Sequence, residues 1–429
     1  MPLHHQDQLF HHLALIFLNE IIFINSHCDI AEKNNLEDSM KILLTTESYY
    51  PNIDGGAIAQ HNLVQELTEM GHEISVIAPG SSFKNIVEKD NGIKIFRTKA
   101  VKLPLYMKSR YYFSPFPVFK VGKIIKEYKP DIIHVCSPYP ISISAMLWAR
   151  KKDIPVLGSI HILPENMISP FFRLKSYKLF EKYSWQYLVY FFNLVDWLTA
   201  PTKTGAEMYI KRGLKKNVTP ISNGLKTDLF NPDNNGEYLR KKFNLPKKNI
   251  VLYTGRINEE KNLEVLIKAI PYVVEQVDAH FLICGEGGEY KQMLINLVKK
   301  LNVYDHTTFT GFLDWKNYPD IYSIADVFAM PAESELQSLV TMEAVASGLP
   351  VVVVNKGALP ELASMDNGLV FEPGNSKHMA DCVIRILLDE KLRKNMGLKS
   401  LELIKKHSME SVANQYEKLY QKIINFYKE

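Results

Sequence analysis

The stretch AESELQSLVTMEAVASGLP, from Ala332 to Pro350, lies between two apolar runs at 326–331 and 351–354. Both runs have the length and composition of buried strands, and the Ser-Gly-Leu-Pro ending is typical of a helix that stops just before the second strand. Open α/β sheets bind ligands at the carboxyl ends of their strands, beside helix N-termini. Glu335 and Glu343, eight positions apart after the first run, are therefore the first candidate site residues.

Outward from this stretch, strand-like and helix-like segments alternate from Met40 onward, which indicates parallel sheets built from βαβ units. A chain of 429 residues favours two domains. The run at 217–237 is rich in Asn, Gly, Pro and Asp, as inter-domain linkers are. The sequence therefore predicts an α/β protein with two doubly wound, Rossmann-like domains facing each other across a cleft, at 40–225 and 226–407.

Residues 1–39 are predicted to be an appendage outside this fold. Their apolar part, 9–24, is shorter than the roughly 20 residues that span a membrane. It also lacks the basic start and the cleavage site of a signal peptide. A short amphipathic anchor on a membrane surface is the alternative interpretation.

The composition is that of an ordinary globular protein, with 46% hydrophobic and 23% charged residues. A net charge of +4, from 51 basic and 47 acidic side chains, gives no reason to expect a nucleic-acid partner. The four cysteines are far apart and form no CxxC spacing, which favours buried free thiols in a reducing compartment such as the cytoplasm. They are Cys28, Cys136, Cys284 and Cys382.

Two basic residues follow the first strand predicted in the second domain. Arg256 comes directly after Gly255, and Lys261 lies five residues further on. Such a pair can neutralise a diphosphate leaving group, although solvated surface charge is the ordinary interpretation. Gly285 and Glu286 end the next predicted strand, where a glycine-rich turn would let a nucleotide approach the backbone.

The first domain offers two further candidates. Gly55 and Gly56 stand between a strand and a helix, where backbone N–H groups can bind a phosphate; an ordinary βα turn explains them equally well. Their spacing matches neither GxGxxG nor the P-loop. His161 ends another strand and can hydrogen-bond a sugar hydroxyl or a leaving group, although a lone histidine is as often structural.

Two glutamates would also suit a retaining glycosidase. Glycosidase carboxylates usually come from different elements, however, and need no dicationic phosphate site. The Arg256 and Lys261 pair favours a phosphorylated donor and a transfer reaction.

Taken together, these motifs resemble the retaining GT-B glycosyltransferases of family 4, in the family's order over about residues 40 to 425. In the second domain they are Gly255-Arg256, Glu260-Lys261-Asn262, Gly285-Glu286-Gly287, Gly311, Ala325-Asp326-Val327, and Glu335 through Glu343-Ala344 to Pro350. In the first domain they are Asp54-Gly55-Gly56, Gly71-His72-Glu73, Pro130 to His134, His161 and Ser222-Asn223-Gly224.

The resemblance implies that the second domain binds a nucleotide diphosphate sugar and the first domain binds the acceptor, with the helix at 408–429 packing back on the first. Arg256 and Lys261 match the diphosphate-binding pair. The chemistry is assigned to His161, Arg256, Lys261 and Glu335. Donor binding is assigned to Gly55, Gly56, Gly255, Gly285, Glu286, Ser338, Leu339 and the ribose-binding Glu343. No metal or other cofactor is expected, and retention at the anomeric carbon is implied.

One departure from the family lies between Glu335 and Leu339. The family commonly has Gly-Phe-Gly after the first glutamate, whereas this chain has Leu336, Gln337 and Ser338. We expect Leu336 and Gln337 to narrow the sugar pocket or to contact a different hydroxyl. The sequence thus leaves the identity of the donor sugar open.

The acceptor is expected to be a lipid, a lipid-linked molecule or a glycan. The segments at 106–120 and 171–197 are aromatic and basic, as surfaces that contact an anionic membrane are, so peripheral membrane binding is one expectation. A cleft-edge loop and a core helix are the alternative. Two other functions also stay open: a GT-B-fold sugar-nucleotide epimerase, and a non-catalytic nucleotide-sugar-binding protein.

Overall fold

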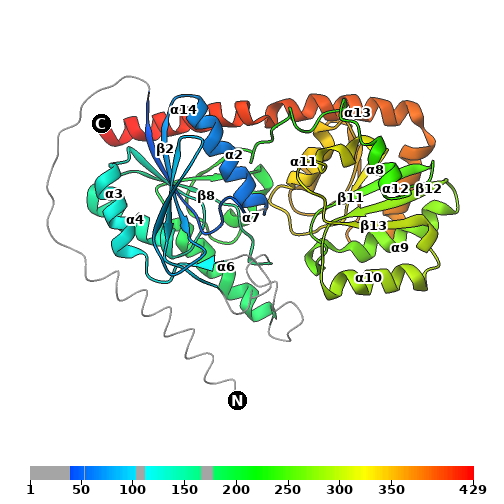
Figure 1. Ribbon diagram of the computed structural model, residues 1–429, viewed down its shortest axis with the longest axis horizontal. Helices are drawn as coiled ribbons and strands as arrows, with labels where there is room; N and C mark the ends of the chain where they lie inside the picture. Colours follow the sequence, from blue (N-terminus) through cyan, green and yellow to red (C-terminus); the bar gives the residue numbers. More distant parts are fainter. Residues whose placement is uncertain (1–38, 53, 103–111, 166–176) are drawn as a thin grey trace, which may run out of the picture.

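The computed structural model describes residues 39–52, 54–102, 112–165 and 177–429. Figure 1 shows two α/β domains side by side, the first in blue to green and the second in green to orange. Apart from Ser39, the appendage predicted at 1–39 lies outside the described residues, as do parts of both aromatic segments.

The first domain is built on an eight-stranded sheet in the order β10-β9-β8-β7-β1-β2-β4-β3. All neighbouring strands are parallel except β3, which pairs antiparallel with β4. The strands are β1 (Lys41–Thr45), β2 (Glu73–Pro79), β3 (Ile86–Asp90), β4 (Ile93–Thr98), β7 (Ile132–Val135), β8 (Val156–Ser159), β9 (Trp197–Ala200) and β10 (Val218–Pro220). β5 (Val101–Lys102) and β6 (Tyr112–Phe113) form a separate pair. The helices are α2 (Gly55–Glu69), α3 (Val118–Tyr128), α4 (Pro140–Lys152), α6 (Tyr177–Asn193) and α7 (Lys203–Ile210).

The second domain has six parallel strands in the order β13-β12-β11-β14-β15-β16, the Rossmann order. They are β11 (Asn249–Thr254), β12 (Ala279–Cys284), β13 (Thr307–Gly311), β14 (Val327–Met330), β15 (Val351–Val354) and β16 (Gly368–Phe371). The α-helices are α8 (Glu237–Lys242), α9 (Leu263–Val274), α10 (Glu289–Lys300), α11 (Leu339–Ala346), α12 (Ser376–Leu388) and α13 (Glu390–Ile404). Short 3-10 turns are η3 (Glu259–Lys261), η4 (Tyr304–His306), η5 (Pro319–Ile324), η6 (Leu359–Ala363) and η7 (Lys405–His407).

The last helix, α14 (Met409–Lys428), runs back over the first domain (Figure 1). Its apolar face belongs to the same core cluster as β1 and β2. The Tyr420 hydroxyl lies 2.7 Å from Nδ1 of the buried His134 in β7, which adds a polar contact to this packing. The chain crosses between the domains at Leu225 and again at Ser408, and these two residues form a parallel β-bridge, so the two crossings lie side by side.

One strand was not predicted from the sequence, and one helix has both a buried and an exposed face. β3 is an edge strand whose side chains are exposed or half-exposed, so it lacks the apolar alternation that identifies a strand. α6 begins at Tyr177 within the described residues and buries only one face, while Leu179, Tyr183 and Tyr190 are exposed. One face of α6 thus packs in the first domain's core, as the core-helix alternative expected, and the other face is exposed.

Candidate functional site

The centre of the site is an ion pair between two loops of the second domain. Lys261 ends η3, which follows β11, and Glu335 lies in the loop after β14, the neighbouring strand. Lys261 Nζ lies 2.6 Å from Glu335 Oε1, and the two side chains are only 14% and 12% exposed. Lys261 and Glu335 thus meet at the carboxyl edge of the sheet, because adjacent parallel strands end there.

Two helix N-termini meet beside this pair. α11 begins after its N-cap Ser338, whose hydroxyl oxygen accepts from the Thr341 N–H. α2 of the first domain begins at Gly55, and a Cβ there would lie 3.4 Å from Leu339 Cδ1 in the first turn of α11. The first N–H groups of a helix have no acceptor within it, and its N-terminus carries partial positive charge. The domains therefore bring two helix N-termini together, and the α2 end already holds the side chain of its N-cap Asp54, which accepts from the Ala57 N–H.

Arg256 lies in the loop between β11 and η3. Its Nη2 is 2.8 Å from Oε1 of the buried Glu260, while the Arg256 side chain is 57% exposed. Both Arg256 and Lys261 are therefore paired with carboxylates. A donor diphosphate that contacts them would compete with Glu260 and Glu335 for these cations.

The glycines of the two neighbouring loops are required by the protein's own packing. A Cβ on Gly285 would lie 1.8 Å from the carbonyl oxygen of Gly255, and one on Gly287 would lie 2.2 Å from that of Ile257. The Glu286 carbonyl accepts from Ile257 N at 2.7 Å, while its side chain is exposed. These glycines thus let the two loops approach each other closely, and the nucleotide contact at Gly285 and Glu286 stays a prediction.

Glu343 lies inside α11 and is buried. Its Oε2 accepts hydrogen bonds from Tyr318 at 2.7 Å and from Tyr322 at 2.5 Å. The Tyr322 hydroxyl also lies 2.8 Å from Thr254 Oγ1, at the end of β11. Burial raises the pKa of Glu343 to about 7, and the two tyrosines oppose that rise. Sequence reasoning missed both tyrosines, since they lie 25 and 21 positions before Glu343 and form no motif with it.

His161 follows β8 of the first domain. Burial lowers its pKa to about 4, so the ring is neutral at pH 7. The Asn223 side chain opposes this lowering of the pKa, although its Oδ1 makes no hydrogen bond within the described residues. The Asn223 backbone N–H in turn donates to Gln337 Oε1 at 2.8 Å. Gln337, two positions after Glu335, thus contacts the turn of the first domain that carries Asn223.

The expectation for Leu336 and Gln337 was wrong, because both side chains point into the first domain. Leu336 belongs to a core cluster of that domain, and its carbonyl accepts from Thr202 Oγ1 at 2.8 Å. Gln337 is buried against Ser222 and Asn223. Each side chain is only 7% exposed. Both are engaged in joining the two domains.

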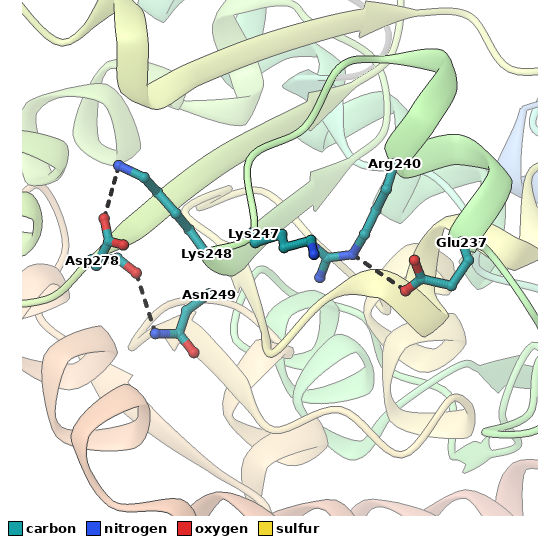
Figure 2. A pocket seen from close by; sticks show the side chains of 6 residues that line it. All are labelled: Glu237, Arg240, Lys247, Lys248, Asn249 and Asp278. Carbon is teal, nitrogen blue, oxygen red and sulfur yellow. Dashed lines mark hydrogen bonds and ion pairs between the residues drawn. The ribbon is translucent and has the colours of Figure 1, made fainter.

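A basic hollow lies at the opposite edge of the second domain's sheet. Lys248 Nζ lies 2.8 Å from Asp278 Oδ1, and Arg240 Nε lies 3.5 Å from Glu237 Oε1. Figure 2 shows these two pairs with Lys247 between them. Asn249 and Asp278 stand at the amino ends of β11 and β12, so this hollow is separate from the predicted site. Within the described ranges, no group of three or more His, Cys, Asp or Glu side chains is placed to hold a metal ion.

Both halves of the chain match known family models. Residues 53–229 match the model described as Glycosyltransferase Family 4, and residues 236–401 match the one described as Glycosyl transferases group 1. A GDP-mannose-dependent alpha-mannosyltransferase of Corynebacterium glutamicum is 25% identical over 388 residues, which cover 90% of this chain and 89% of that protein. An alpha-monoglucosyldiacylglycerol synthase of Streptococcus pneumoniae is 26% identical over 331 residues, which cover 76% of this chain and 73% of that protein.

The fold also has a close counterpart among solved structures. Sucrose-phosphate synthase from Thermosynechococcus elongatus superposes with a TM-score of 0.76 at 21% identity, covering 90% of this chain and 100% of that one. The family models follow the order of the two domains and together span most of the chain. The protein therefore belongs to the family 4 glycosyltransferases and has their two-domain GT-B fold.

Proposed function

We propose that this protein transfers a hexose-type sugar from a nucleotide diphosphate sugar to an acceptor hydroxyl, with retention at the anomeric carbon. The observation that carries the proposal is the shielded Lys261–Glu335 ion pair beside the N-termini of α11 and α2. Glu335 would accept hydrogen bonds from hydroxyls of the donor sugar. Lys261 and Arg256 would face the diphosphate.

The charges suit the departure of a nucleoside diphosphate. The bond from the anomeric carbon to the diphosphate oxygen breaks while a bond to the acceptor oxygen forms on the same face, and the hydroxyl proton passes to the departing diphosphate. Lys261, Arg256 and the two helix ends would stabilise the negative charge that develops, in positions already fixed by the fold. We propose that these groups serve in place of a metal ion. The neutral His161 would contact the sugar.

We further propose a lipid or lipid-linked acceptor, reached at the cytoplasmic face of a membrane. None of the described helices is both long and apolar enough to cross a bilayer. Phe116 and Phe119, at the start of α3, are 86% and 87% exposed. Exposed phenylalanines near lysines can insert between lipid headgroups. The similarity to a glucosyldiacylglycerol synthase favours such an acceptor.

The test begins with the melting temperature of the full chain in the presence of UDP, GDP, ADP and their sugar conjugates, because a ligand of the native state raises it. The stabilising donor is then incubated with diacylglycerol vesicles. We expect a glycolipid whose anomeric coupling in proton NMR matches that of the donor. Inversion would overturn the mechanism. Interconversion of the donor without an acceptor would identify an epimerase, and binding without turnover a non-catalytic protein.

A further inference from the structure

The carboxyl of Glu343 is held through only one of its two oxygens. Tyr318 and Tyr322 both donate to Oε2, at 2.7 Å and 2.5 Å. A carboxylate oxygen accepts about two hydrogen bonds, so these two hydroxyls fill Oε2. Within the described residues no hydrogen bond reaches Oε1, and this atom is not one of the fully enclosed polar atoms without a partner. Oε1 is therefore the oxygen that a ligand can contact.

The two phenol rings are themselves fixed by their neighbours. Their hydroxyls lie 2.8 Å apart, and the Tyr322 hydroxyl also lies 2.8 Å from Thr254 Oγ1. Phe230 meets both rings edge to face, with centroid distances of 6.1 Å to Tyr318 and 5.8 Å to Tyr322. Trp315 stacks on Tyr318 at 5.7 Å. A packed and hydrogen-bonded network of this kind holds one arrangement, so the two rings fix the direction in which Oε1 points.

We propose that Tyr318 and Tyr322 are positioning residues, which leave Glu343 a single free oxygen, Oε1, for the two hydroxyls of the donor's ribose. Oε1 can accept two hydrogen bonds, and the ribose of a nucleoside diphosphate offers two neighbouring hydroxyls. This role rests on the proposed function, in which the second domain binds a nucleotide diphosphate sugar. The selectivity for ribose can nevertheless be measured by nucleotide binding, without any sugar transfer.

Tyr238 supplies a matched control. Its hydroxyl donates to Asp320 Oδ2 at 2.9 Å. Asp320 lies in η5, the 3-10 turn that directly follows Tyr318. Tyr318→Phe and Tyr238→Phe therefore each remove one tyrosine hydroxyl that donates to a carboxylate beside the start of η5. Only the first change removes a donor to Glu343.

The experiment measures nucleotide binding by calorimetry. The probes are the nucleoside diphosphate that stabilises the chain most, among UDP, GDP and ADP, and its 2′,3′-dideoxy form, which lacks both ribose hydroxyls. We expect the wild type to bind the ribose form about 10-fold or more tightly than the dideoxy form. In Tyr318→Phe this preference should fall to about twofold or less, through weaker binding of the ribose form alone. Tyr238→Phe should keep the preference of the wild type.

Equal weakening of both nucleotides in Tyr318→Phe would show a structural role only and would overturn the proposal. A lost preference in Tyr238→Phe as well, or a wild type that does not distinguish the two nucleotides, would also overturn it. If Tyr318→Phe does not fold, Tyr322→Phe replaces it, and the same results support or contradict the role.

The positioning role and the proposed transfer reaction fail separately. A ribose preference that Tyr318→Phe removes, in a protein that transfers no sugar, would support the positioning and count against the transfer. Sugar transfer without any ribose preference would contradict the positioning alone. A chain that binds neither nucleotide would contradict both.

Discussion

Lys261 Nζ and Glu335 Oε1 are 2.6 Å apart, and this contact joins the loops that follow the two central strands of the second domain. Both side chains are largely shielded from water, where an ion pair is strong and an unpaired charge is costly. The two groups therefore hold each other in place without a ligand. A donor that inserts a diphosphate and a sugar between these loops would find a cation and a hydrogen-bond acceptor already fixed in position.

Removing this cation should abolish transfer. We expect Lys261→Met to lower kcat/KM by about 100-fold or more, because in the proposed mechanism the charge that develops on the leaving diphosphate loses a fixed cation. The matched control is Lys248→Met, which breaks the pair with Asp278 in the hollow at the opposite edge of the same sheet (Figure 2). The test compares kcat/KM of the two purified variants in steady-state assays. Equal activities of the two variants would show that Lys261 has no role in the transfer reaction.

The buried Glu343 should make stability depend on pH. The pKa of this carboxyl is raised from 4.5 to about 7, so the folded state keeps a proton that the unfolded state loses between these values. The ionised carboxylate therefore destabilises the fold progressively as pH rises through this window. Glu343→Gln should match the wild type below pH 4.5 and exceed it above pH 7, by at most about 3 kcal/mol.

Melting temperatures of both proteins from pH 4 to pH 8.5 test this expectation. Asp233→Asn, in an exposed loop, is the control and should give the same small difference at every pH. A Glu343→Gln difference that stays constant or shrinks as pH rises would show that Glu343 is not held in the neutral form.

The strand ends of the second domain could be predicted because short sequence patterns indicate where each strand stops. Runs of apolar residues predict the strands. Arg256 and Lys261 lie in the loop that follows the first of these strands. The edge strand β3 was missed because its side chains are mostly exposed, although Asn91 and Gly92, both with positive φ, form the kind of turn that joins hairpin strands. The Asn91-Gly92 dipeptide was the feature of the sequence that could have predicted this hairpin.

The partners of the candidate residues could not be predicted in the same way. Gln337 meets Ser222 and Asn223 across 115 and 114 positions, and no periodicity relates side chains from two domains. Leu336 and Gln337 were expected to line a sugar pocket because the sequence shows only their neighbours along the chain. Their contacts depend on how the domains dock, which is a property of the assembled fold.

Tyr420 should stabilise the packing of helix α14 on the first domain. The Tyr420 hydroxyl lies 2.7 Å from His134 Nδ1, and His134 Nε2 lies 2.6 Å from Ser159 Oγ. Tyr420→Phe would leave a buried ring nitrogen without a partner, at a cost of about 1–3 kcal/mol. We expect a lower urea midpoint than in Tyr183→Phe, a change at an exposed position of α6. Equal midpoints would mean that apolar packing alone attaches the helix.

The exposed aromatic residues at the start of α3 should determine membrane binding. Phe116 and Phe119 are almost fully exposed, so their insertion would remove apolar surface from water and contribute about 2 kcal/mol each. In flotation assays with vesicles rich in phosphatidylglycerol, Phe116→Ser/Phe119→Ser should bind at least about tenfold more weakly than the wild type. Tyr304→Ser removes a comparably exposed aromatic ring from the second domain and should bind as the wild type does. If the double variant floats with the vesicles as well as the wild type, another surface makes the contact; if the wild type itself does not float, the acceptor must reach the protein in solution.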